Sequence, residues 1–449
     1  MKTGKTENKR MAGVWTGGLS AFCLLLTAAH FLRAGDPAAV VLCLLMAVCS
    51  FFHTGWLVRS VTVLLAGGTL FWGVETVQLA QARMVAGLPF LHLLLVLSGV
   101  VLAHAAAVFL MRKRWQPVNG AQKARSTVFT MSLFLLLALN TFVPFPLLAG
   151  ERLIPLPGIN GLLIAALAWW GGFCAQGLSD PRTSPSRRRL MWTVFASVFF
   201  LQFFLGVTVA VSLLMTGRLH LPVPFMMLSG PVYRGEGIFM ICLFCVSVLI
   251  AGSAWCSHLC YFGIWDCLSA SSSQRRLRPA PVGSGARDWR LPVLAAAVAV
   301  PLILNVLQAS YSVVVGAALA FMALAPLMWY MSSRSGGRVY CSSFCPMGLV
   351  AGLLGKLSPW RLSVDKDRCT GCMKCAAACQ DRAMILREGK CEISYRCTLC
   401  RDCLMFCSHG ALSLDCTLPV RGRRRISADP AFIITISLMH ILFLATARI

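Results

Sequence analysis

The sequence predicts a mainly α-helical, polytopic membrane protein with about eleven spans and one small α+β domain. Of its 449 residues, 57% are hydrophobic and only 13% are charged, and the mean hydropathy is +0.73. Soluble globular domains are about 45–50% apolar and about 25% charged, so a soluble enzyme of this length is excluded. The small domain is indicated by one long polar stretch near the C-terminus that contains closely spaced cysteines.

Apolar runs of about 20 residues recur along the chain, and each is long enough to cross a bilayer. The first four predict an N-terminal membrane module over residues 12–112, and the next six predict a membrane core over residues 128–360. The predicted spans are approximately 13–32, 38–57, 61–80, 88–111, 128–149, 158–177, 191–215, 237–255, 291–308, 311–331 and 431–447. Residues 418–449 are expected to form a basic linker and the last of these spans.

The formal net charge is +25, and the basic residues are distributed unevenly between the two sides of the predicted topology. With the N-terminus inside, the inner segments hold 35 of the 41 Lys and Arg residues, and the outer segments hold 6. Basic residues concentrate on the cytoplasmic side of a membrane. We therefore expect a bacterial inner-membrane protein with a cytoplasmic N-terminus and a cytoplasmic polar stretch. The basic residues flank spans and form no basic face of a soluble domain, so membrane lipid is an expected partner and nucleic acid is not.

The strongest motif is a doubled C-x2-C-x2-C-x3-C pattern in the polar stretch, where about half of the 21 cysteines lie. Iron in a [4Fe–4S] cube takes four soft thiolates in a tetrahedral set, and the x2 spacings wrap a tight loop around one cube. The pattern therefore predicts a two-cluster ferredoxin domain over residues 365–417, in preference to a zinc ribbon. The first copy is Cys369, Cys372, Cys375 and Cys379, and the second is Cys397, Cys400, Cys403 and Cys407.

In this pattern the fourth cysteine of each copy ligates the other cluster. The apolar segments after the two copies, 383–386 and 411–414, are expected to be strands that exclude water from the clusters. Cys391 and Cys416 lie outside the pattern and are expected to be packed thiols. The predicted ligands are Cys369, Cys372, Cys375 and Cys407 for cluster 1, and Cys397, Cys400, Cys403 and Cys379 for cluster 2.

A second pair of motifs follows two of the predicted spans on the inner side. Both have the form aromatic-C-x3-C-x2-G, and cysteines four residues apart share one face of a helix. The motifs predict either a third metal centre held by four thiolates or two redox-active dithiol pairs, with simple packing of small side chains as the structural alternative. Their cysteines are Cys256 and Cys260 in the first motif, and Cys341 and Cys345 in the second.

Paired C-x3-C motifs at membrane helix ends, followed by a double ferredoxin motif, resemble the NosR/NapH group of membrane polyferredoxins over about residues 128–420. The resemblance implies a multi-span core and electron transfer connected to the quinone pool or a periplasmic redox partner. It makes the chain a candidate quinol dehydrogenase component. The segment 365–417 departs from bacterial two-cluster ferredoxins at Gln380 and Ser408, which replace the usual proline after the fourth cysteine.

Four of the eight histidines lie in the N-terminal module. His30 and His92 are expected near the outer face, and His53 and His104 toward the inner side. Two imidazoles at one depth on different helices can hold a haem b. Intramembrane histidines also serve as quinone contacts or as hydrogen-bonded packing between helices. The pairs His30/His92 and His53/His104 are therefore candidates for any of these three roles.

The sequence thus favours a membrane-bound iron–sulfur protein that moves electrons between the quinone pool or cytoplasmic donors and a respiratory or periplasmic partner. A redox-sensing regulatory protein, or a maturation protein for another metalloenzyme, is the second hypothesis. A transporter with an accessory ferredoxin is the third. That hypothesis predicts inverted repeats or broken helices with paired polar sites, and the sequence shows no clear sign of either.

Overall fold

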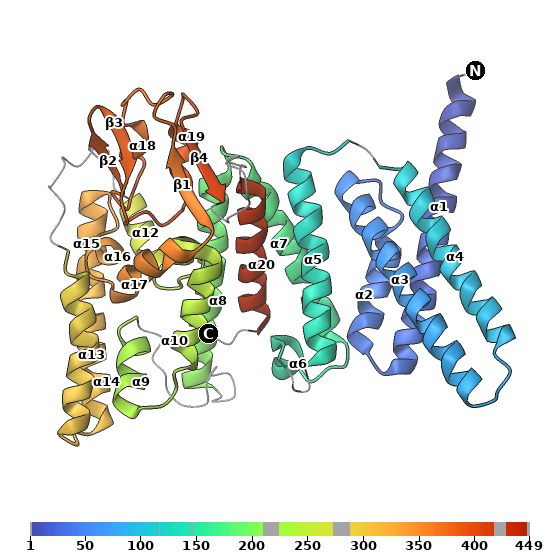
Figure 1. Cartoon of the computed structure of the whole chain (residues 1–449), viewed down its shortest axis with the longest axis horizontal. Helices are drawn as coiled ribbons and strands as arrows, with labels where there is room; N and C mark the ends of the chain where they lie inside the picture. The colour runs from blue at the N-terminus through green and yellow to red at the C-terminus, as the bar shows by residue number, and fades with distance from the viewer. Residues whose placement is uncertain are drawn as a thin grey trace. The chain divides into compact units, whose positions relative to one another are not determined.

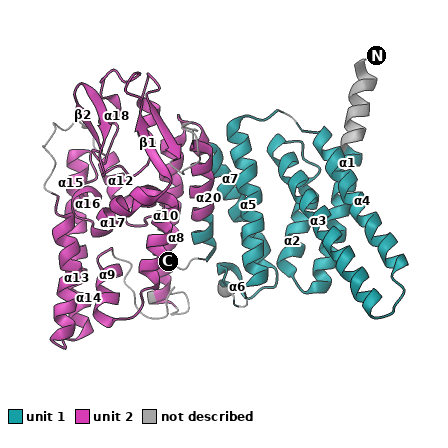
Figure 2. Ribbon diagram, in the orientation of Figure 1, with its two compact units in different colours: residues 1–176, 441–447 teal, residues 177–440, 448–449 magenta. Residues whose placement is uncertain are grey.

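The computed structural model of the chain describes residues 2–115, 117–143, 145, 147–209, 224–272, 288–416 and 428–446. Within these residues it is mainly helical, with short strands only near the C-terminus (Figure 1). Two compact units are distinguished (Figure 2): unit 1 contains residues 1–176 and 441–447, and unit 2 contains residues 177–440 and 448–449. The predicted basic linker, residues 418–427, lies outside the described part of the chain.

Nine helices in the described part of the chain are long and apolar enough to cross a membrane, which confirms the mainly α, polytopic fold class. The other two predicted spans, 38–57 and 291–308, coincide with shorter helices, α2 (Pro37–Cys49) and α13 (Arg290–Val306), of 13 and 17 residues. At about 1.5 Å per residue, these helices extend about 20 and 26 Å, less than the roughly 30 Å hydrocarbon core of a bilayer. The nine are Val14–Ala34, Gly55–Val85, Leu91–Lys113, Gly120–Phe142, Ile159–Ser179, Ser184–Gly206, Phe239–His258, Tyr311–Ser335 and Asp429–Thr446.

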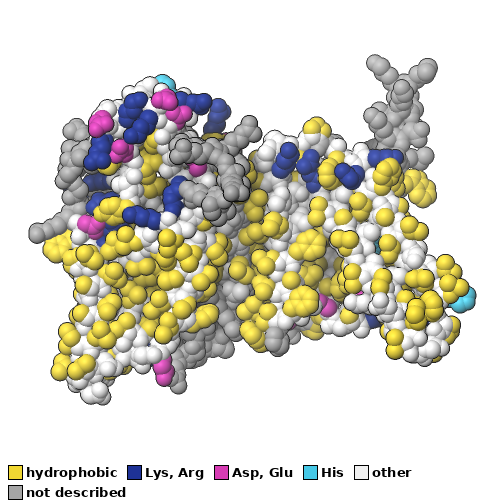
Figure 3. Space-filling model, viewed as in Figure 1, with side chains coloured by type: hydrophobic (Ala, Val, Ile, Leu, Met, Phe, Trp, Pro, Cys, Tyr) yellow, Lys and Arg dark blue, Asp and Glu magenta, His cyan; other side chains and the backbone are white. Residues whose placement is uncertain are grey.

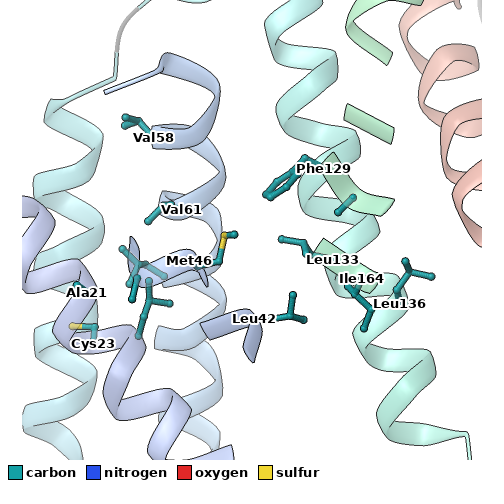
Figure 4. Packing of buried hydrophobic residues seen from close by; sticks show 14 of the residues in the cluster. Ala21, Cys23, Leu42, Met46, Val58, Val61, Phe129, Leu133, Leu136 and Ile164 are labelled. Atoms are coloured by element: carbon teal, nitrogen blue, oxygen red, sulfur yellow. The ribbon is translucent and has the colours of Figure 1, made fainter. Parts of the chain in front are cut away.

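Unit 1 is a helical bundle around an apolar core. Val61, Leu136 and Ile164, from three different helices, are fully buried in this core (Figure 4). α2 can begin at a proline because the first helical N–H needs no partner, and Asp36 caps it by accepting from the N–H of Ala39 at 3.0 Å. The helices of unit 1 are α1 (Lys2–Ala34), α2, α3 (Gly55–Val85), α4 (Leu91–Lys113), α5 (Gly120–Phe142), α6 (Ala149–Leu153) and most of α7 (Ile159–Ser179).

Unit 2 contains the remaining helices and all of the described strands. Apolar side chains cover its helical part, and Lys and Arg side chains gather over the end that carries the strands (Figure 3). Its helices are α8 (Ser184–Thr208), α9 (Met226–Arg234), α10 (Phe239–Ala251), α11 (Trp255–His258), α12 (Gly263–Ser271), α13, α14 (Tyr311–Ala323), α15 (Ala325–Ser335), α16 (Val339–Ser343), α17 (Pro346–Leu354), α18 (Lys374–Ala377), α19 (Asp402–Phe406) and most of α20 (Asp429–Thr446).

The ferredoxin domain is made of two similar halves, each a cysteine loop, a short helix and a strand. Strand β1 (Trp360–Val364) pairs antiparallel with β4 (Leu412–Cys416), and β2 (Met384–Arg387) pairs antiparallel with β3 (Lys390–Ile393). β2 and β4 coincide with the two strands predicted after the cysteine motifs. Apolar side chains between them pack around the cysteines, as the sequence predicts.

A break in one long apolar helix brings it against the ferredoxin domain. α10 ends before Gly252, which has a φ of +68° and a backbone so close to Ser358 that a Cβ would lie 2.8 Å from its Oγ. A short 3-10 turn (Gly252–Ala254) then leads into α11. Ser253 Oγ donates to the carbonyl oxygen of Cys397 at 2.7 Å, and Ser257 Oγ donates to that of Thr398 at 2.7 Å. The second cysteine loop is therefore docked onto the end of this helix.

Candidate metal centres

The two cysteine loops of the ferredoxin domain have the same backbone conformation. In the first loop, Gly371 and Met373 have φ angles of +70° and +56°. The equivalent residues of the second loop, Leu399 and Arg401, have φ angles of +49° and +67°. Left-handed conformations are costly for residues other than glycine. Their use at the same two positions indicates that both loops are held in one shape by the same requirement.

The fourth cysteines of the two copies also have matching surroundings. The N–H of Ala383 donates to Cys379 Sγ at 3.3 Å, and the N–H of Ala411 donates to Cys407 Sγ at 3.2 Å. A backbone donor at a cysteine sulfur stabilises its thiolate form. The residue just before each following strand thus provides a backbone donor that favours metal ligation by the fourth cysteine.

The four cysteines of the predicted cluster 1 lie around one cavity. Cys369, Cys372 and Cys375 of the first copy line it, together with Cys407 of the second copy. Cys391, which was predicted to be a packed thiol, is buried in β3 and lines the same cavity. Its Sγ lies 3.6 Å from Cys375 Sγ, and this hydrogen bond lowers the pKa of Cys375 to about 7.

The four cysteines of the predicted cluster 2 form a second, more deeply buried group. Burial raises the pKa of Cys397 and of Cys379 to about 12. Burial also raises the pKa of Cys403 well above its usual value, and the neighbouring charges of Cys400, Cys397 and Cys379 add to this effect. Thiols in such a group stay protonated at neutral pH unless a metal ion replaces their protons.

Both groups offer the soft sulfur donors that an iron–sulfur cluster requires. No set of three or more His, Cys, Asp or Glu side chains among the described residues has the arrangement of a ready-made metal site. The fit to [4Fe–4S] clusters therefore depends on the repeated loop conformation, the shared cavity and the chemistry of the donors.

Polar contacts fix the ferredoxin domain to the helices of unit 2. Arg188 on α8 forms a 2.6 Å ion pair with Asp402 and also donates to the carbonyl oxygen of Ser257 at 3.1 Å. Gln380, at the position where ferredoxins have a proline, donates to Ser271 Oγ on α12 at 2.9 Å. The departure from the ferredoxin pattern thus provides a contact between the domain and the helices.

The two C-x3-C motifs have the same local fold. α11 and α16 end before the second cysteine of each motif, so the expectation that both cysteines share one helix face is wrong. The N–H of Cys260 donates to the carbonyl oxygen of Trp255 at 3.0 Å, and that of Cys345 donates to Tyr340 at 3.0 Å. This turn draws the second cysteine of each motif back toward the aromatic residue that begins the motif.

The glycine at the end of each motif is required by a close backbone approach. A Cβ at Gly263 would lie 3.1 Å from the carbonyl oxygen of Cys256, and a Cβ at Gly348 would lie 3.1 Å from that of Cys341. The N–H of each glycine also donates to the sulfur of the second cysteine in its motif. The two motifs therefore repeat one cysteine-binding turn.

The two motifs interlock. α11 contacts α17, and α12 contacts α16, so each motif touches the helix associated with the other. Asp266 on α12 accepts from the N–H of Cys341 at 2.8 Å, and the ring centroids of Phe262 and Tyr340 lie 5.0 Å apart. One cavity is lined by all four motif cysteines and by a cysteine of the ferredoxin domain: Cys256, Cys260, Cys341, Cys345 and Cys397.

A buried charged network connects the second C-x3-C motif to the ferredoxin domain. Arg338, which is 2% exposed, forms an ion pair with Asp381 and donates to Thr398 Oγ1 at 2.9 Å. Thr398 Oγ1 in turn donates to Asp381 at 2.6 Å. Burial raises the pKa of Cys260 and Cys341, and the charge of Arg338 opposes this rise.

The sequence motifs did not point to Arg338, Asp381 or Arg188. A signal was present for the first two, because each is a charged residue within three positions of a motif cysteine. Arg188 carried no such signal, because its partner Asp402 is 214 residues away in the sequence.

His104 is buried, and protein groups engage both of its ring nitrogens. Nε2 lies 3.2 Å from Thr27 Oγ1, and Nδ1 lies 3.0 Å from the carbonyl oxygen of Val100. His104 borders an apolar cavity of about 190 Å³ between the helices of unit 1. A haem iron or a quinone carbonyl that bound to His104 would have to displace one of these two partners.

The other three histidines of the N-terminal module have different surroundings. His30 packs against Trp72, with ring centroids 5.1 Å apart, and Trp72 also packs against His104 at 6.5 Å. His53 is exposed and contacts Arg114, and His92 is exposed. His30 and His104 are thus neighbours of one tryptophan, a relationship that differs from the predicted pairs.

Two family models match parts of the chain. One, for a 4Fe–4S binding domain, matches residues 234–278 and 314–365, and each of these blocks contains one C-x3-C motif. Another model of a 4Fe–4S binding domain matches residues 362–385, which contain the first ferredoxin motif. An uncharacterised protein of Methanocaldococcus jannaschii is 28% identical over 76 residues, which are 17% of this chain and 30% of that protein. No solved structure matches the chain significantly.

Proposed function

We propose that this chain is an electron-transfer protein of a bacterial inner membrane, with two [4Fe–4S] clusters in a cytoplasmic ferredoxin domain. The observation that carries the proposal is the pair of identically folded cysteine loops, in which Cys407 of the second copy shares a cavity with three cysteines of the first. When bound, the clusters supply one-electron redox chemistry. The chain supplies the ligands, excludes water and provides the hydrogen bonds that set the potentials.

The ligand sets follow the crossed pattern of two-cluster ferredoxins. Cys407 belongs to the first set because it lines the first cavity. Cys379 belongs to the second set because its charge interacts with those of Cys400 and Cys403. The assigned ligands are Cys369, Cys372, Cys375 and Cys407 for cluster 1, and Cys397, Cys400, Cys403 and Cys379 for cluster 2.

The two sets differ in their access to other molecules. In the first set Cys372 is exposed, so this cluster would be open to a soluble redox partner. The second set is docked on α8, α11 and α12, as the contacts of Arg188, Ser257 and Gln380 indicate. We propose that electrons pass between a partner at the exposed cluster and the membrane at the docked cluster. A role as quinol dehydrogenase component, by analogy with the NosR/NapH group, is consistent with this order.

A quinone site is proposed for the apolar cavity beside His104. A quinone ring needs an apolar pocket with a hydrogen-bond donor at its edge, and His104 and Thr27 border this cavity. Haem b at His30, His53, His92 or His104 stays a prediction that optical spectra of the purified protein will test.

The rival is a regulatory or maturation protein, in which the clusters sense redox state or deliver electrons for the assembly of another metalloenzyme. The two functions differ in their response to quinol. A chain that exchanges electrons with the quinone pool is reduced rapidly by a quinol analogue. A maturation protein is not, and its deletion removes metal from another enzyme.

The direct test is quantification of iron and acid-labile sulfide in anaerobically purified protein, with EPR spectra of the reduced form. The ferredoxin domain accounts for about eight iron and eight sulfide per chain. Cys369→Ser and Cys397→Ser should each abolish one of two EPR signals, and Cys416→Ser, outside both sets, should abolish neither. Zinc without acid-labile sulfide would overturn the proposed function.

A further inference from the structure

We propose that Cys256, Cys260, Cys341 and Cys345 form a third metal centre, shared by the two C-x3-C motifs. Four thiolates form a donor set for iron, either as a [4Fe–4S] cluster or as a single tetrahedral ion. Metal binding here does not depend on the proposed ferredoxin clusters, because none of these cysteines belongs to either ferredoxin set.

The two motifs have the same backbone structure around their cysteines. Each motif has a short helix that ends before the second cysteine, a return hydrogen bond to an aromatic residue, and a glycine whose N–H donates to the sulfur. Backbone donors at sulfur stabilise thiolates. Packing alone requires small side chains and does not require the same donor to be directed at the same sulfur in both copies.

The interlocked helices bring the two copies to one cavity. All four cysteines line it, although the motifs are separated by 80 residues of sequence. The hydrogen bond from the N–H of Cys341 to Asp266 fixes the second motif to the helix that follows the first. Two candidate ligands from each motif therefore line one cavity, as a shared site requires.

Two buried polar atoms beside the cysteines have no hydrogen-bond partner among the residues that the structure describes. They are Nη1 of Arg338 and the hydroxyl oxygen of Tyr340, and both side chains are at most 2% exposed. An unsatisfied buried polar atom costs about 1–3 kcal/mol, so such atoms in a native protein call for an explanation. A metal–thiolate centre carries negative charge and sulfur acceptors. It would therefore explain both a buried guanidinium and a buried hydroxyl next to these cysteines.

The same cavity is lined by Cys397 and Thr398 of the second ferredoxin loop. Ser253, on the turn before the first motif, donates to the carbonyl oxygen of Cys397 at 2.7 Å. The third centre would thus adjoin the ferredoxin loop that faces the helices. This position deepens the proposed function, since it adds a redox group between the ferredoxin domain and the membrane-spanning helices.

Metal content tests the inference on the full-length protein in detergent. Anaerobically purified wild type should contain more iron than its ferredoxin domain holds, namely about 12 iron and 12 sulfide for a third cube, or about nine iron for a single ion. The double variant Cys260→Ser, Cys345→Ser should lose the excess and keep about eight iron and both ferredoxin EPR signals. Cys242→Ser, an exposed cysteine on the same apolar span, is the matched control and should keep all of the iron.

Alkylation provides a second readout that needs no variant. The four cysteines of the holoprotein should resist iodoacetamide until the metal is removed with a chelator under reducing conditions, as peptide mass spectrometry will show. A Cys256–Cys260 or Cys341–Cys345 disulfide in the untreated protein would overturn the inference, and so would free alkylation of all four. Purified wild type that held iron at the third centre and none in the ferredoxin domain would overturn the proposed function but would support the third centre.

Discussion

Arg338 and Asp381 form an ion pair that is buried on both sides, with the two side chains 2% and 5% exposed. Arg338 precedes the second C-x3-C motif, and Asp381 follows Cys379 of the ferredoxin domain by two residues. The pair therefore joins the two parts of unit 2 that contain candidate metal ligands. Because Thr398 bonds to both members, the network also reaches the loop of the second ferredoxin set.

Arg338→Met should destabilise the protein by about 3–5 kcal/mol, because it leaves the carboxylate of Asp381 buried without its partner. The double variant Arg338→Met, Asp381→Asn should recover part of this loss. Arg368→Met is the control, since its ion pair with Asp365 is exposed, and it should cost about 0–1 kcal/mol. Denaturant titration in detergent measures these differences, and equal losses for Arg338→Met and Arg368→Met would contradict the network.

The crossed ligand pattern makes a specific prediction about which variants share a phenotype. Cys407→Ser should abolish the same EPR signal as Cys369→Ser, because both cysteines line the first cavity. Cys403→Ser, only four residues from Cys407 in the sequence, should abolish the other signal. If Cys407→Ser and Cys403→Ser removed the same signal, each copy would bind its own cluster and the crossed assignment would be wrong.

The sequence predicted what depends on local spacing. The positions of β2 and β4 follow from short apolar runs after each cysteine motif, and both are present. The span predicted at 38–57 is partly wrong, because hydropathy alone does not reveal where a helix ends. In the structure, α2 ends at Cys49 and α3 begins at Gly55, within the same apolar run.

The sequence could not predict what depends on long-range contacts. Arg188 and Asp402 are 214 residues apart, and Arg338 and Asp381 are 43 apart, so no local pattern indicates that they pair. A joint site of the two C-x3-C motifs was one of the alternatives that the sequence predicted, and their four cysteines line one cavity. The break at Gly252, which docks the ferredoxin loop beside that cavity, was not predicted, because one glycine in an apolar run carries no such information.

Cys391 should tune the potential of cluster 1 without binding iron. Its sulfur lies 3.6 Å from Cys375 Sγ, where a thiol can donate a hydrogen bond to a ligand sulfur. Hydrogen bonds to cluster sulfurs are one determinant of cluster potential. Cys391→Ala removes the donor, so the midpoint potential should become more negative, while Cys391→Ser keeps a donor and should shift it less. Redox titration by EPR measures both variants, and loss of iron in Cys391→Ser would instead make Cys391 a ligand.

The ferredoxin domain should face the cytoplasm together with the N-terminus. Eight of the nine long apolar helices in the described part of the chain precede β1, and an even number of crossings returns the chain to its starting side. The parity is the same if the shorter helices α2 and α13 also cross. A reporter active only in the periplasm should be silent when fused after Asp415 and active when fused after Ile449. Activity of the reporter fused after Asp415 would contradict the topology expected from the basic residues.

His104 should contribute to quinone binding in the cavity of unit 1. A short-chain quinone analogue that accepts one hydrogen bond from His104, in place of one of its two present partners, would lose about 0.5–1.5 kcal/mol of affinity in His104→Phe, a roughly two- to tenfold weaker binding. Equilibrium dialysis in detergent micelles measures this change. Thr76→Val is the control, because Thr76 is buried on the same helix as Trp72 but does not line the cavity. Equal quinone binding by wild type and His104→Phe would contradict the proposed quinone site in this cavity.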